Sequence, residues 1–203
     1  NWLAGGSCFS PYKSGLGVPI ELSLAVHSDA GFAKDYSSII GSLSICTTKT
    51  GNGLLASGQS RRHAKTFANY LLDGINRDIR QTYGKWNKRD LYDRNYAETR
   101  CTDVASAIIE TMSHQNFPDM AMGQDPNFRF TLARSLYKSI LRFNSEMHDK
   151  PYVVTPLAPE NFCADFLVGD TLLLRWDAQQ DAAEPSAMPT SYILYTAAGT
   201  SGF

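Results

Sequence analysis

Apolar and polar residues alternate with a period of two near the start of the chain. Residues 20–26 follow this pattern and predict a strand that stops at the polar, turn-prone segment His27–Gly31. A second strand is predicted over residues 42–47. The apolar run 105–109 predicts a buried central strand, and it leads directly into Glu110.

Two segments have the period of a helix. Between about residues 59 and 83 the apolar positions are Ala64, Phe67, Ala68, Leu71, Ile75 and Ile79. Ser57 or Ser60 can cap the start of this helix. A second helix is predicted to begin at Asp125 as N-cap with Pro126 in the first turn. Its apolar face is formed by Phe128, Leu132, Leu136, Ile140 and Phe143.

The pattern changes after about Asn144. Residues 146–151 have the composition of a linker, and the remaining predicted elements are strands over 162–166, 171–176 and 191–196. Strands that alternate with helices, followed by strands alone, predict an α/β domain and then an all-β part.

The composition is that of a globular protein. Apolar residues make up 43% and charged residues 19% of the 203 residues, and the formal net charge is -1. This balance gives no electrostatic reason to expect nucleic acid or an anionic membrane as a partner. Cysteines occur at positions 8, 46, 101 and 163 without a CxxC pair, so we expect most of them to be small buried apolar residues.

His27 and Glu110 are the residues that suggest chemistry. Each follows a predicted strand, and ligands bind at the carboxyl ends of strands in open α/β sheets. A carboxylate at the end of a buried strand needs a partner or a function. A metal ligand beside a general base is one interpretation. A purely structural role for both residues is the other.

Several segments resemble the catalytic domain of the zinc-dependent N-acetylmuramoyl-L-alanine amidases. The segment Leu24–Ala30 is similar to the strand motif that supplies a zinc-binding histidine. The segment Ala107–Asn116 is similar to the motif that carries the catalytic glutamate, and Asp125–Arg129 to the start of the closing helix. These segments occur in the family's order between Leu22 and about Phe143. The resemblance implies a three-layer α/β/α fold, with His27 as a zinc ligand and Glu110 as the general base.

The family's first zinc-binding histidine and its glutamate ligand have no counterpart ahead of His27. We therefore expect the chain to be truncated at its N-terminus and its Zn²⁺ site to be incomplete. We also expect that the isolated chain holds no stoichiometric zinc and does not cleave peptidoglycan. Met112-Ser113-His114 replaces a phenylalanine-containing segment of the family, which indicates a divergent branch.

Other polar residues are candidates for binding substrate. His114 and Asn116 follow Glu110 closely, and His114 is equally explained as a hydrogen-bonded loop residue. Arg94 and Arg100 would lie on one face with Tyr92, Tyr96 and Glu98 if this segment is extended. That row could bind the carboxylates of a stem peptide, or it could be a solvated edge with salt bridges. His63 is expected to face solvent, and His148 is expected to belong to the linker and to be inert.

The C-terminal part resembles the opening of a fibronectin type III domain. Residues 156–162 are similar to the approach to the first strand, Trp176 to the core tryptophan of the second, and 192–195 to the third strand. The predicted division is an amidase-like domain over 1–146, a linker over 147–155 and part of a β-sandwich over 156–203.

The resemblance implies a secreted or periplasmic hydrolase of the bacterial envelope that acts on the amide between N-acetylmuramic acid and L-Ala in peptidoglycan. Two alternatives remain open. One is a non-catalytic cell-surface or carbohydrate-binding module on a degenerate amidase scaffold. The other is part of a polysaccharide lyase-like envelope protein.

Overall fold

The computed structural model describes residues 2–3, 5, 12–197 and 199. The chain divides into two compact units, Asn1–Tyr152 and Val153–Phe203, and each is described by itself. Within the described part of the chain, no helix has the length and apolar character needed to cross a bilayer.

The first unit is built on a four-stranded mixed sheet with the order β1-β4-β2-β3. Its strands are β1 (Leu22–Asp29), β2 (Ser42–Cys46), β3 (Lys88–Asp93) and β4 (Ala105–Ser113). β1 is parallel to β4 and β2 to β3, whereas β2 and β4 are antiparallel. The three strands predicted for this unit, over residues 20–26, 42–47 and 105–109, are confirmed. β1 and β4 run further than predicted, so His27 and Glu110 lie inside their strands and not after them.

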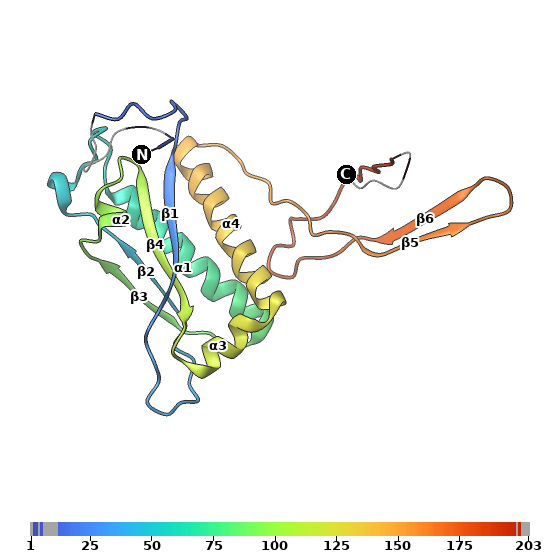
Figure 1. Ribbon diagram of the computed structural model, residues 1–203, viewed down its shortest axis with the longest axis horizontal. Helices are drawn as coiled ribbons and strands as arrows, with labels where there is room; N and C mark the ends of the chain where they lie inside the picture. The colour runs from blue at the N-terminus through green and yellow to red at the C-terminus, as the bar shows by residue number, and fades with distance from the viewer. Residues whose placement is uncertain (1, 4, 6–11, 198, 200–203) are drawn as a thin grey trace. The chain divides into compact units, whose positions relative to one another are not determined.

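Two long helices, α1 (Arg62–Tyr83) and α4 (Pro126–His148), run side by side along one face of the sheet (Figure 1). The predicted apolar face of α1 is fully buried. Phe67 of α1 and Phe143 of α4 lie 4.9 Å apart between ring centroids. The helices approach closely at Gly74, where a Cβ would meet Ser139 Oγ at 2.4 Å. The core therefore lies between this helix pair and the sheet.

The helix ends agree with the sequence in part. Asp125 caps α4 by accepting a hydrogen bond from the backbone N–H of Asn127 at 2.9 Å, as predicted. α4 continues to His148, so residues 146–148 belong to the helix and not to a linker. α1 begins at Arg62, later than predicted, and Ser60 Oγ accepts from the N–H of Arg62 at 3.2 Å.

We call the opposite face of the sheet, away from α1 and α4, the second face. It carries a small apolar cluster formed by Leu43, Ile45 and Ile108, with Ala25 and Tyr92 packed beside it. The short helix α2 (Ala97–Arg100) lies over this face, since Ser106 Oγ of β4 donates to the carbonyl of Thr99. The predicted α/β class is confirmed: the helix pair packs on one face of the sheet, and α2 lies over the second face in the described part of the chain. Two further short helices are η1 (Thr50–Gly53) and α3 (Phe117–Gln124).

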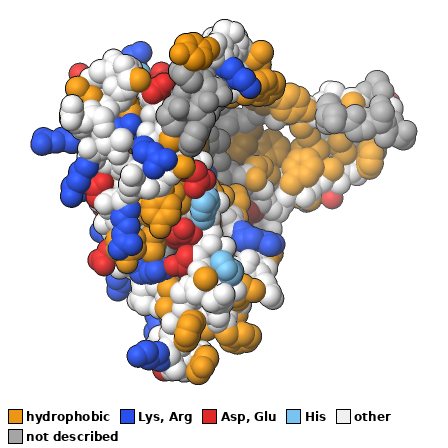
Figure 2. Space-filling model, turned by 60° about the vertical axis from the view of Figure 1, so that its left-hand side comes forward, with side chains coloured by type: hydrophobic (Ala, Val, Ile, Leu, Met, Phe, Trp, Pro, Cys, Tyr) orange, Lys and Arg blue, Asp and Glu red, His pale blue; other side chains and the backbone are white. Residues whose placement is uncertain are grey.

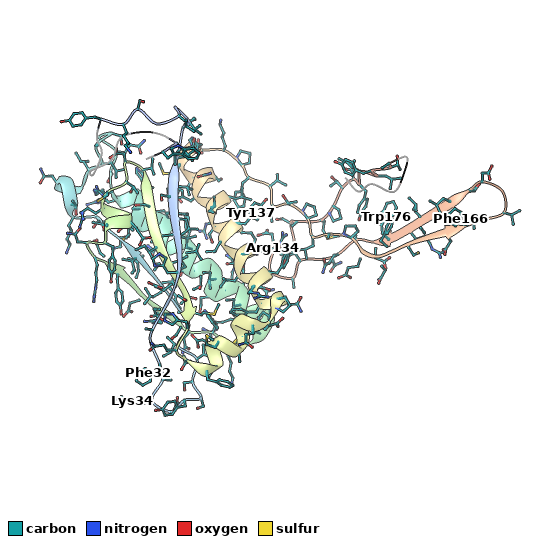
Figure 3. All side chains as sticks on the ribbon, viewed as in Figure 1. Phe32, Lys34, Arg134, Tyr137, Phe166 and Trp176 are labelled. Atoms are coloured by element: carbon teal, nitrogen blue, oxygen red, sulfur yellow. The ribbon has the colours of Figure 1, made fainter. Side chains whose placement is uncertain are left out.

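The second unit contains a β-hairpin of two antiparallel strands, β5 (Glu160–Phe166) and β6 (Leu172–Asp177). Trp176 of β6 contacts two rings, Phe162 at 6.4 Å and Tyr192 at 5.2 Å between centroids. Phe166 lies toward the turn of the hairpin, away from Trp176 (Figure 3). The strand predicted over 191–196 is not formed, because apolar character alone supplies no pairing partner for its backbone.

Candidate functional site

His27 and Glu110 are partners in the register of β1 and β4. Residues that pair across neighbouring strands project to the same face. The second face therefore carries both side chains, and His27 Nδ1 lies 3.8 Å from Glu110 Oε1. The two side chains therefore lie next to each other, while their chemical roles stay predictions.

The Glu110 carboxyl lies in a mostly buried environment. Its side chain is 14% exposed, and its Oε2 atom is buried without a hydrogen-bond partner in the described part of the chain. Burial raises the pKa of this carboxyl above its ordinary value. Asp29 and Glu98 raise the pKa further, whereas His27 and Arg89 oppose the shift. Figure 2 shows histidine, acidic and basic side chains gathered around apolar ones on the face turned toward the viewer.

A third residue, Glu98 of α2, joins this pair. Its Oε1 atom lies 3.1 Å from His27 Nε2, so the imidazole is held between two carboxylates. The sequence predicted Glu98 only as part of an extended segment that shares one face with Arg94 and Arg100. That prediction is wrong for residues 97–100, which form the helix α2, because the extended strand β3 ends at Asp93.

His114 lies near His27 but forms its own contacts. Its Nδ1 atom is 3.1 Å from Ser28 Oγ and 3.2 Å from the Ser28 carbonyl oxygen. Its backbone N–H donates to Asp29 O at 2.9 Å. This placement agrees with the alternative of a hydrogen-bonded loop histidine.

Asn116 is buried, and its amide holds the loop between β1 and β2. Its Oδ1 accepts from the N–H of Ala33 at 3.1 Å, and its Nδ2 donates to Ser38 O at 3.0 Å. Nδ2 also donates to Asp119 Oδ1 at 2.9 Å. The far end of this loop carries Phe32 and Lys34 (Figure 3). We therefore assign Asn116 a structural position and do not include it among the groups that could contact substrate.

The two arginines differ in their surroundings. The Arg94 guanidinium is exposed and stacks on the Tyr92 ring, with Cζ 4.5 Å from the centroid. Tyr92 belongs to the second face, beside Ile45. Arg100 Nη1 instead donates to Asn95 Oδ1 at 3.0 Å. Arg94 is thus the better placed of the two to meet an anionic ligand.

Two hollows adjoin His27. One has mainly apolar walls that include Val26, Met112 and Met120, together with His114. The other contains Glu98, Ser23 and Thr102. His27 is among the lining residues of both hollows.

A separate hollow of unit 1 is lined by residues that include Glu21, His63, Asp103 and His148. Glu21 Oε2 and His148 Nε2 lie 3.0 Å apart there. This hollow includes Ala105 at the start of β4, away from Glu110, and His148 ends α4 where a linker was predicted.

The site holds some of the groups that a zinc ion needs. An imidazole nitrogen and carboxylate oxygens are suitable zinc donors, and Glu110 Oε2 has no hydrogen-bond partner among the described residues. However, Glu98 faces Nε2 and Glu110 faces Nδ1, so one ion on His27 could meet only one of them. No group of three His, Cys, Asp or Glu side chains suited to a metal occurs among the described residues. The described residues fit one side of a zinc site and not a complete site.

Comparison with known proteins gives fold neighbours only. No family model matches the chain, and no curated protein matches its sequence. Among solved structures, it is similar to an N-acetylmuramoyl-L-alanine amidase from Clostridium difficile 630 at 14% identity and a TM-score of 0.46. That match covers 62% of this chain and 58% of the other.

Two further solved structures give similar values. The CwlD amidase from Clostridioides difficile, solved with the GerS lipoprotein, is 14% identical with a TM-score of 0.48 and covers 62% of this chain and 55% of that one. An amidase from Mycobacterium smegmatis is 18% identical with a TM-score of 0.47 and the same coverage. The chain thus spans between half and two thirds of the length of these structures.

Proposed function

We propose that this chain carries the His27–Glu110 part of the catalytic site of a zinc-dependent N-acetylmuramoyl-L-alanine amidase. Two segments that resemble motifs of this family lie far apart in the sequence, yet they pair in register on β1 and β4. The observation that carries the proposal is the 3.8 Å approach of His27 Nδ1 to Glu110 Oε1.

In this proposal Glu110 moves the proton. Its carboxylate accepts a proton from the attacking water and donates it to the leaving amine nitrogen as the amide C–N bond breaks. A carboxyl whose pKa is raised by burial suits both steps, since it binds and releases a proton nearer to neutral pH. His27 is one zinc ligand, and the other two would come from outside the described residues.

The substrate would be a peptidoglycan strand or its stem-peptide fragments. Arg94 is suited to a carboxylate of the stem peptide, because guanidinium groups bind carboxylates through two parallel hydrogen bonds. The hollow beside Val26, Met112 and Met120 would receive an uncharged part of the substrate. His114 borders that hollow, whereas Arg100 is engaged with Asn95.

The proposed location is outside the cytoplasm, in the periplasm, on the outer surface or in the medium. Peptidoglycan is found there, and Cys101 is disulfide-bonded. Disulfide bonds persist mainly in oxidising compartments. Cys46 and Cys163 are free thiols.

A second candidate function is a non-catalytic module that binds the cell surface. It needs no metal ligands from outside the described residues, among which no three-ligand metal group occurs. The two candidates differ in what the full-length protein does with purified peptidoglycan: an amidase releases stem peptides, whereas a binding module sediments with peptidoglycan and releases nothing.

The test is Glu110→Gln in the full-length protein. We expect zinc content to be retained and peptide release to fall by at least about 10²-fold, the usual scale for losing acid–base catalysis. Glu21→Gln is the matched control, because Glu21 also pairs with a histidine but lies away from the site. Unchanged release by Glu110→Gln would refute the assignment. Sedimentation without release by the wild type would favour the binding module.

A further inference from the structure

The contact between Glu98 and His27 restricts the protonation of the imidazole ring. A carboxylate can only accept a hydrogen bond, so Nε2 must carry the proton in the 3.1 Å contact with Glu98 Oε1. A neutral imidazole has one donor and one acceptor nitrogen. Nδ1 is then left with its lone pair on the side of Glu110.

The backbone that carries Glu98 is held firmly, although the carboxylate itself is half exposed. Thr99, the next residue, is buried, and its Oγ1 lies 2.7 Å from Thr47 Oγ1. The buried Arg61 donates from Nη1 to Thr99 O at 3.2 Å and from Nη2 to Arg100 O at 2.8 Å. These bonds fix α2 against the start of α1 and the end of β2, so Glu98 reaches His27 from a rigid support.

We propose that Glu98 is a positioning residue, which fixes the tautomer and ring orientation of His27 so that Nδ1 is the ligand nitrogen on the Glu110 side. Histidines that bind metals commonly donate their other N–H to a carboxylate, which sets the tautomer and raises the basicity of the ligand nitrogen. The buried Oε2 of Glu110, which has no partner among the described residues, belongs to the carboxylate that Nδ1 faces. The tautomer of His27 follows from the contact with Glu98 alone. The role of Nδ1 as the zinc-binding nitrogen rests on the proposed function.

The tautomer is measured by two-bond ¹H–¹⁵N correlation spectra of the histidine rings in the chain, at a pH where the rings are neutral. We expect the wild type to carry the proton of His27 on Nε2. Glu98→Ala should lose this single tautomer. Glu98→Gln should retain it, because the amide oxygen still accepts a hydrogen bond.

Glu21→Ala is the matched control, since Glu21 contacts His148 Nε2 at 3.0 Å with similar exposure. It should leave the His27 signals unchanged. A proton on Nδ1 in the wild type, or an unchanged His27 tautomer in Glu98→Ala, would overturn the positioning role. A merely structural effect of the substitution would shift other ring signals and would not be restored by Glu98→Gln.

The ligand assignment is tested by zinc competition titration of the full-length protein. Loss of a carboxylate behind a metal-binding histidine typically weakens metal affinity by 10- to 100-fold. We expect about tenfold for Glu98→Ala, because the carboxylate is half exposed, and a smaller loss for Glu98→Gln. Unchanged affinity in Glu98→Ala would refute the ligand assignment. If the wild type binds no zinc, the proposed function fails, and the spectra still decide the role of Glu98.

Discussion

Asp119→Ala removes the acceptor that holds the loop after β1 to the end of β4. The fully buried carboxylate of Asp119 accepts hydrogen bonds from Ile40 N, Gly41 N, Ser113 N and Asn116 Nδ2, at 2.9–3.1 Å. The substitution leaves these donors without an acceptor. Each buried donor without an acceptor lowers the free energy of unfolding by about 1–3 kcal/mol. Partial relaxation and water entry would reduce the sum, so we expect a loss of about 4 kcal/mol in the free energy of unfolding.

The assay is urea denaturation followed by circular dichroism, with Asp125→Ala as the matched control. Asp125 accepts one backbone N–H as the N-cap of α4, so its loss should cost about 1 kcal/mol. A loss for Asp119→Ala no larger than that of Asp125→Ala would show that the loop is not held by this carboxylate.

The remaining predictions concern Cys46 and Arg94. Burial, with Asp93 adding to it, raises the pKa of the Cys46 thiol to about 11, so a maleimide at pH 8 should modify Cys163 and leave Cys46 unmodified until the chain unfolds. Because the unfolded thiol ionises near its ordinary pKa of about 8.5, the stability from a neutral Cys46 should be complete below that pH. It should be lost as pH rises toward 11, and Cys46→Ala should remove this part of the pH dependence. In the full-length protein, Arg94→Ala should raise KM for a stem-peptide substrate about tenfold or more with kcat retained, the scale of one lost charge-assisted hydrogen bond. An unchanged KM would exclude Arg94 from substrate binding.

The sequence predicted the elements whose signals are local. The apolar run before Glu110 is typical of a buried strand, and Asp125-Pro126 gives a helix start with a defined hydrogen bond. The alternation before His27 predicted the strand that leads to this residue. The pairing of β1 with β4 in register, which brings His27 to Glu110, was not predicted.

What the sequence did not predict depends on contacts distant in the chain. Glu98 is a half-exposed residue in a polar segment, and nothing in its neighbours indicates that it reaches His27. α2 is stabilised by the guanidinium of Arg61, far earlier in the chain, which donates to the carbonyl oxygens of Thr99 and Arg100. Residues 191–196 have strand-forming side chains but no partner strand among the described residues, so their propensity is not realised.

The central claim is that His27 and Glu110 belong to a zinc site, and zinc-edge anomalous diffraction from crystals of the full-length protein tests it most directly. We predict one zinc peak at about 2.0–2.1 Å from His27 Nδ1. Glu110 should lie on the same side of His27 as this zinc, within reach of a water bound to the metal, and His27 Nε2 should still contact Glu98. A zinc-loaded crystal with no peak at His27, or with His27 and Glu110 turned away from the metal, would contradict the account.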